Sequence, residues 1–138
     1  MQIGKRTVPR SERIMTPELK AKWIDALTSG AYKQGRFRLK RTKEAFCCLG
    51  VLCDISETGQ WITAKNGEHF FYPHAGSTML CHGAERCISG LSWQLRECLG
   101  LPADAHLNLV QMNDNKVPFN EIAAWIENNV RTQIAKVI

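Results

Sequence analysis

The chain has 138 residues, of which 44% are hydrophobic and 22% charged, and its formal net charge is +5. This length fits one domain, and the balance of apolar and charged residues excludes wholesale disorder. No apolar run approaches the roughly 20 residues of a membrane-spanning helix, so we expect no contact with a membrane. No apolar stretch follows Lys5 and Arg6, and we therefore expect no secretory signal.

The positive charge is concentrated in the first third of the chain. Residues 1–43 hold twelve Lys and Arg against three acids, a net charge of +9. Residues 44–138 hold six basic and ten acidic residues, a net charge of −4. Such local basicity indicates a surface that faces an anion, although a purely solubilising role is the alternative.

The first expected helix opens at Thr16-Pro17-Glu18, which combines an N-cap, a proline suited to the first helical position and an acid near the positive end of the dipole. Apolar residues recur at helical spacing from Leu19 to Leu27. Gly30 is expected to end this helix in a left-handed conformation. The preceding residues, 1–15, are expected to form a flexible basic arm, and residues 16–138 a single domain.

From residue 36 the sequence alternates between basic and apolar side chains. In an extended chain Arg36, Arg38 and Lys40 would share one face. Phe37 and Leu39 would then share the opposite face. This pattern predicts a half-buried strand with a cationic outer surface.

The apolar run that follows is ambiguous between a buried strand and a helix, and we favour a helix from about Cys48. Its inward residues would be Leu49, Leu52 and Ile55, and Gly50 would allow close packing.

Residues 61–65 and 68–72 flank Asn66-Gly67, which is a strong signal for a hairpin with a type I′ turn.

Residues 73–90 are expected to form a long loop, and residues 91–99 a short helix closed by Gly100. Residues 107–112 suggest a last strand, and residues 113–115 an Asx turn. A clean apolar stripe predicts a final helix containing Phe119, Ile122, Ala123, Ile126 and Val130. The expected fold class is α+β, with helices packed on a small, mostly antiparallel sheet.

Several phrases of the sequence resemble a family of small proteins encoded by tailed bacteriophages and prophages. They are the run from Trp23 through Ser29-Gly30 and Gln34-Gly35 to Cys47–Asp54, and the closing Met112-Asn113-Asp114 with Phe119–Glu127. The resemblance spans roughly residues 16–130 and implies a phage gene product acting in the bacterial cytoplasm. It implies no activity.

Two positions depart from the pattern of that family. Phe37 stands where members often have a small or polar residue, and a bulky residue there fits a tight backbone approach poorly. Pro118 replaces a serine that often precedes the closing phenylalanine, which removes a helix N-cap.

The basic segment is the first candidate site. Guanidinium groups form paired hydrogen bonds with phosphate, and aromatic rings stack on bases. The expected ligand-binding residues are Tyr32, Gln34, Arg36, Arg38, Lys40 and Arg41. Their partner would be a host protein or a phosphate-bearing ligand such as a nucleotide or nucleic acid. Alternatively, the cations only protect a sheet edge from aggregation.

A cysteine nucleophile is the second candidate, because a helix N-terminus lowers the pKa of a thiol. Cys48 lies at such a position, and His69 on a predicted strand is its weak candidate partner. The simpler interpretation is that Cys48 is one of six reduced cysteines and is buried for packing.

Two further sites are weaker. Cys81, His82 and Cys87 crowd one loop, but their spacing is poor for zinc. Trp125 lies beside the apolar stripe of its helix and is a candidate partner contact.

The sequence as a whole favours a binding protein over an enzyme. It contains no phosphate loop, dinucleotide fingerprint or paired-carboxylate motif, so we expect no cofactor. With the resemblance, the leading hypothesis is a phage-encoded protein that inhibits or sequesters a host component, such as one of antiviral defence, through its basic face. The alternatives are a cysteine hydrolase that uses Cys48 and a nucleic-acid-binding module.

Overall fold

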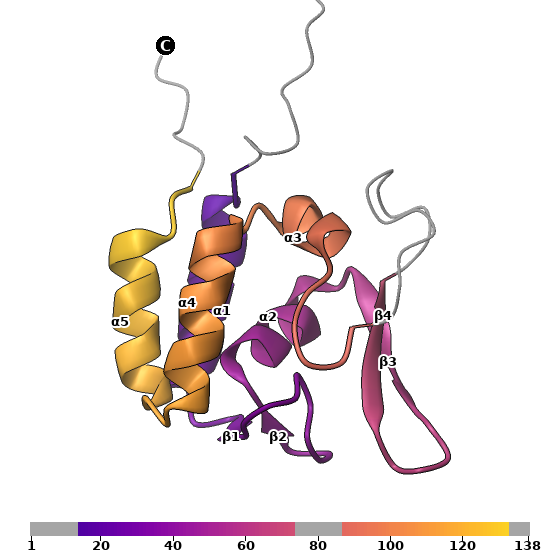
Figure 1. Cartoon of the computed structure of the whole chain (residues 1–138). Coiled ribbons are helices and arrows are strands. Elements are labelled where there is room, and N and C mark those ends of the chain that lie inside the picture. The colour runs from indigo at the N-terminus through magenta and orange to yellow at the C-terminus, as the bar shows by residue number, and fades with distance from the viewer. Residues whose placement is uncertain (1–13, 74–86, 133–138) are drawn as a thin grey trace, which may run out of the picture.

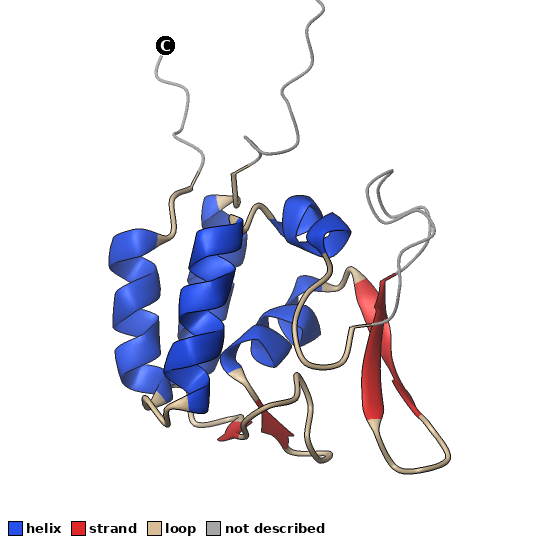
Figure 2. Cartoon of the chain, viewed as in Figure 1, coloured by secondary structure: helices blue, strands red, loops and turns tan. Residues whose placement is uncertain are grey.

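The computed structural model of the chain describes residues 14–73 and 87–132. Within these ranges the elements are α1 (Pro17–Thr28), β1 (Lys33–Gln34), β2 (Ala45–Phe46), α2 (Cys48–Ser56), β3 (Gly59–Thr63), β4 (His69–Pro73), α3 (Trp93–Leu99), α4 (Ala103–Asp114) and α5 (Phe119–Asn129). The predicted α+β class is confirmed (Figure 1, Figure 2). The strands form two separate pairs, β1 with β2 in parallel and β3 with β4 in antiparallel orientation.

Helices α1, α4 and α5 lie side by side, with α2 packed against α1 and α4 (Figure 1). The hairpin β3–β4 stands on the other side of α2, and the short β1–β2 pair lies at one end of the helices. One connected cluster of buried apolar side chains joins the helices to the inner face of the hairpin. None of the described helices combines the length and the apolar character needed to cross a membrane.

Both ends of α1 follow the sequence prediction closely. The side chain of Thr16 accepts a hydrogen bond from the Leu19 amide at 3.1 Å, and Gly30 has a left-handed φ of +83°. Residues 1–13 of the expected arm lie outside the described residues. Met15, the last residue of the expected arm, is buried and forms a β-bridge with Thr132.

Helix α2 begins at Cys48, as predicted, and its close approach to another segment requires a glycine. A Cβ atom on Gly50 would lie 1.8 Å from the backbone oxygen of Leu39. Leu49 and Leu52 are buried, and Ile55 is half-buried. The helix is therefore pressed against the segment that precedes β2.

The predicted hairpin is present, but its turn differs from the expected type I′. Thr63 pairs with His69, and the Ala64 and Glu68 backbones are joined by a 2.8 Å hydrogen bond. Only Gly67 in the turn has a positive φ, of +89°, and its amide donates to the Ala64 carbonyl. This is a three-residue loop with a glycine bulge, the next most common hairpin connection after the two-residue turns.

The predicted strand over residues 36–40 is wrong. Phe37 adopts a left-handed φ of +72°, which breaks the two-residue period, so its side chain is 53% exposed rather than inward. Leu39 is fully buried as expected, and Lys40 forms an isolated bridge with Phe46. The segment is a loop, and the strand pairing begins earlier, at β1.

The predicted strand over residues 107–112 is also wrong, because these residues belong to α4. Ala105, Leu109 and Asn113 are spaced four apart and form the buried side of that helix, whereas Leu107 is 56% exposed. The polar side chain of Asn113 interrupts the apolar stripe and disguises its period. The expected Asx turn is accordingly the last turn of α4, with Asn115 at the C-cap.

The last two predicted helices are confirmed with small shifts. Helix α3 starts two residues later than expected, after Ser92 as N-cap, and ends at Gly100 with a φ of +78°. Helix α5 buries the predicted apolar stripe. Its N-cap position is Pro118, which makes no side-chain capping bond, as its replacement of serine implies.

Candidate anion-binding site

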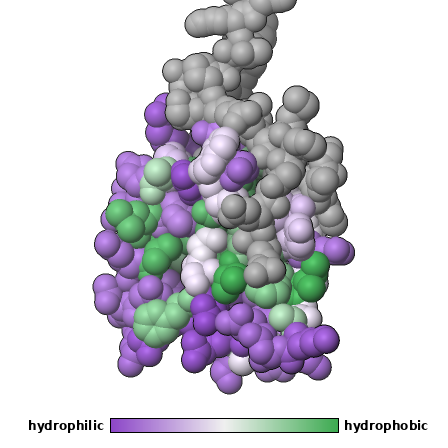
Figure 3. Space-filling model, turned by 45° about the vertical axis from the view of Figure 1, so that its right-hand side comes forward, coloured by the Kyte–Doolittle hydropathy of each residue, from purple (hydrophilic) through white to green (hydrophobic). Residues whose placement is uncertain are grey.

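A hollow of about 240 Å³ opens between the loop that joins β1 to β2 and the turn of the hairpin. It is lined by Arg38, Lys40, Arg41, Asn66, Gly67, Glu68 and His69. Hydrophilic residues cover the corresponding lower part of the surface in Figure 3. The hollow therefore joins three of the predicted cationic residues to a hairpin turn far from them in sequence.

The loop is held in place through the backbone of Leu39, at its centre. The Leu39 amide donates to the Ile88 carbonyl at 2.7 Å, and its carbonyl accepts from the Cys47 amide at 3.0 Å. Its fully buried side chain anchors the loop in the core. Because Leu39 is fixed, the side chains on either side of it, Arg38 and Lys40, have defined starting points.

Lys40 is positioned by aromatic rings rather than by a carboxylate. Its Nζ lies 5.3 Å from the ring centroid of Phe46 and 5.2 Å from that of Trp61. These rings belong to an edge-to-face series that continues to Tyr32 and Phe71. A cation over a ring keeps its charge available to a ligand, which a carboxylate partner would neutralise.

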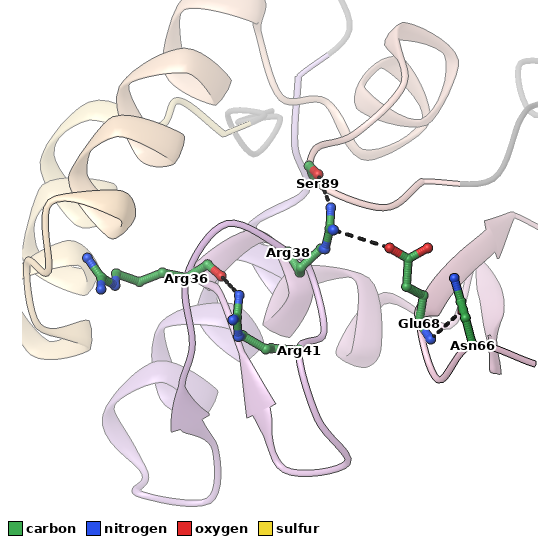
Figure 4. A network of polar contacts seen from close by, with 6 residues as sticks. All are labelled: Arg36, Arg38, Arg41, Asn66, Glu68 and Ser89. Carbon is green, nitrogen blue, oxygen red and sulfur yellow. Dashed lines mark hydrogen bonds and ion pairs between the residues drawn. The ribbon is translucent and has the colours of Figure 1, made fainter. Parts of the chain in front are cut away.

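The two arginines of the hollow have different partners (Figure 4). Arg38 forms an ion pair with Glu68 at 3.2 Å and donates to the Ser89 hydroxyl at 3.4 Å. Arg41 donates to the Arg36 carbonyl at 3.3 Å. In the part of the chain that the structure describes, no carboxylate lies within ion-pair distance of Lys40 or Arg41.

The hollow keeps a positive charge after these contacts. Three cations face one carboxylate, that of Glu68. Partial burial, and then the charges of Lys40 and Lys43, lower the pKa of His69 and so disfavour its protonated form. Its Nδ1 lies 2.9 Å from the Thr63 hydroxyl. An exposed pair such as Arg38 with Glu68 contributes little stability, and an anion can displace the carboxylate from it.

The other half of the predicted ligand-binding set lies elsewhere. Tyr32 donates to Asp54, and burial followed by this hydrogen bond raises the tyrosine's pKa. Gln34 donates to Asn113 at 3.1 Å and to the Val117 carbonyl at 2.8 Å. These side chains join separate elements of the fold and do not line the hollow, and their role in ligand binding stays a prediction.

Arg36 is likewise separated from the hollow. It donates to the Asp114 carbonyl at 3.2 Å, and it extends away from Arg38 in Figure 4. The expectation that Arg36, Arg38 and Lys40 share one face is therefore wrong, because the left-handed turn at Phe37 separates Arg36 from the other two.

Two structural roles were not predicted from the sequence, one in the hollow and one in the interior. The turn residues of the hairpin were assigned only a structural role, although they close one side of the hollow. Asn113 was assigned to a turn, but it is 1% exposed and accepts from the Cys48 amide and the Gln34 side chain, both at 3.1 Å. It also donates to the Gly35 carbonyl at 2.7 Å. Asn113 lies four residues after Leu109, and this helical spacing was the signal in the sequence that Asn113 belongs to the buried side of a helix.

The arrangement does not support Cys48 as a nucleophile. The side chain is fully buried, and its Sγ lies 3.7 Å from the Leu109 carbonyl. Burial raises the pKa of the Cys48 thiol well above its usual value, which is opposite to the expected effect of the helix N-terminus. His69 lines the large basic hollow, whereas Cys48 lines a different and much smaller one. The proposed pair is therefore not assembled.

The remaining candidates are only partly described. Cys81 and His82 lie outside the described residues, and Cys87 is buried opposite Phe71 in a β-bridge. Residues 14–73 and 87–132 contain no group of three potential metal ligands. Trp125 is half-buried and packs against the core, so part of its ring remains at the surface.

Fold and site together define a small α+β protein with a cationic hollow between a loop and a hairpin turn. A comparison with protein families matches residues 15–130 to the domain of unknown function DUF8296, and the chain belongs to this family. Comparisons with curated proteins and with solved structures find no match.

Proposed function

We propose that this protein is a phage-encoded, non-enzymatic binding protein that acts in the host cytoplasm. It sequesters a phosphate-bearing host component, such as one used in antiviral defence, in the hollow beside Lys40 and Arg41. The phage origin and the cellular location rest on the family resemblance of the sequence phrases. The ligand chemistry rests on the hollow.

The observation that carries this proposal is the positive charge that the hollow retains. Lys40 is held over Phe46 and Trp61, and Arg41 is held by a backbone carbonyl. Both cations are therefore oriented without being neutralised. Arg41 offers further guanidinium N–H donors, and arginine is well suited to bind phosphate through two of them.

A titration with inorganic pyrophosphate, followed by NMR, tests this function. We expect the amide signals of Gly67 and His69 to shift, and Arg41→Glu to weaken binding at least about tenfold, because it replaces an attractive charge by a repulsive one. Lys22→Glu is the matched control, since it makes the same change of charge on the exposed side of α1. Equal weakening in both variants, or no binding at millimolar pyrophosphate, would contradict the proposal.

A further inference from the structure

Phe37 combines an exposed side chain with a strained backbone conformation. A left-handed φ of +72° is unfavourable for a bulky residue, and such conformations persist where surrounding contacts enforce them. Here the Phe37 amide donates to the Asp114 carboxylate at 3.2 Å. The neighbouring Arg36 is tied to the Asp114 carbonyl, also at 3.2 Å. The end of α4 therefore fixes the backbone on which the ring is carried.

The strain is not compensated by burial of the ring. Phe37 remains 53% exposed, and the Arg36 guanidinium carbon lies 4.9 Å from its ring centroid. This cation restricts the ring and leaves much of its surface accessible. A rigid, exposed aromatic ring beside cations is the arrangement that proteins use to stack nucleobases.

The backbone that carries the ring leads directly into the basic hollow, because Phe37 is followed by Arg38 and Lys40, which line it. Arg38 follows Phe37 directly and lines both the basic hollow and a smaller one that Phe37 also lines. The Cα atoms of Phe37 and Lys40 are three residues apart, hence no more than roughly 11 Å from each other.

We infer that Phe37 is a stacking platform for a nucleobase whose phosphate occupies the hollow. The inference rests on the proposed function and names its ligand class, a phosphate attached to a base. Arg38 separates the two subsites and can turn from Glu68 to the phosphate. Either a free nucleotide or a single-stranded nucleic acid supplies this chemistry.

The test compares a short oligothymidylate with an abasic oligodeoxynucleotide of the same length. We expect Phe37→Gly to weaken oligothymidylate binding about tenfold or more and to leave abasic binding unchanged, because only the base contacts the ring. Phe37→Tyr restores binding. The glycine relieves the left-handed strain and removes a half-exposed ring, so the melting temperature should change by less than about 4 °C.

Trp93→Ala is the matched control, since it removes another aromatic side chain that is 48% exposed, and it should not affect binding. Thymidine 5′-monophosphate identifies the source of the base. Affinity equal to that of the oligonucleotide assigns a free nucleotide, whereas affinity that rises with length and falls steeply with salt assigns a strand.

Two results overturn the inference and spare the proposed function. In the first, Phe37→Gly binds oligothymidylate as tightly as the wild-type protein does, while Arg41→Glu still binds pyrophosphate more weakly. In the second, the two oligonucleotides bind the wild-type protein equally. If the wild-type protein itself does not bind pyrophosphate, the proposed function is contradicted instead.

Discussion

The interior around Asn113 and the basic hollow use polar groups in opposite ways. Asn113 is 1% exposed, and its amide makes three hydrogen bonds to groups on α2 and on the segment around β1. In the hollow, Lys40 and Arg41 are fixed by rings and by a carbonyl, so their charges stay available. Polar groups are satisfied within the fold in the first region, whereas two cations in the second have no carboxylate partner among the described residues.

The same loop belongs to both regions. Leu39 is fully buried and bonded through its amide and carbonyl, whereas Lys40, the next residue, faces the hollow. A rigid interior therefore determines where exposed cations stand. Changes to the interior should cost stability, and changes to the charged side chains of the hollow should cost binding alone.

The largest expected effect on stability comes from Gly50→Ala. Its Cβ would lie 1.8 Å from the Leu39 carbonyl oxygen, so α2 or the loop must move. We expect a loss of more than about 3 kcal/mol in the free energy of unfolding, measured by urea denaturation. Gly67→Ala is the control, with a φ of +89° and no neighbour within 4 Å, and should cost only about 1 kcal/mol. Similar losses would show that α2 does not press on the loop.

Asn113→Ala should cost about 2–4 kcal/mol, because it leaves the Cys48 amide buried without its acceptor. Asn108→Ala on the same helix removes an exposed amide bonded to the Asp104 carbonyl and should change stability by less than about 0.5 kcal/mol. Chemical denaturation of both variants measures the difference. If Asn113→Ala is as mild as its control, the interior does not depend on this amide.

A smaller, pH-dependent effect is expected from His106, which joins the loop before α3 to α4. Its Nε2 accepts from the Leu91 amide at 3.0 Å. Burial, and then the charge of Arg96, lowers the pKa of His106 from 6.5 to about 4. Between pH 6.5 and about pH 4, this histidine is protonated in the unfolded chain but neutral in the folded protein. Its contribution to the free energy of unfolding is therefore fully present above pH 6.5 and is lost as the pH falls towards 4.

We expect this imidazole to account for about 1 kcal/mol of the stability lost between about pH 7 and pH 5, after allowance for its partial exposure. Urea denaturation of wild-type protein and of His106→Gln at both pH values isolates it, because other titrating groups are common to the two. Equal pH dependence in both proteins would show that His106 does not titrate as described.

Local patterns in the sequence determined most of the elements. Thr16-Pro17-Glu18 specified the start of α1, and the apolar stripe of α5 specified its buried side. Gly50 was expected to allow close packing, and Gly67 lies in the turn of the expected hairpin. These predictions succeeded because capping bonds, helical periodicity and turn conformations depend on residues only a few positions apart.

Tertiary structure alone decided the direction of the basic segment and the role of Asn113. Alternation from residue 36 indicated a strand, but the Asp114 carboxylate at the end of α4 holds the Phe37 amide in a left-handed turn. That turn points Arg36 away from Arg38, and the remote hairpin completes the hollow. No local pattern encodes contacts between residues almost eighty positions apart, and these contacts outweigh the local preference for an extended chain.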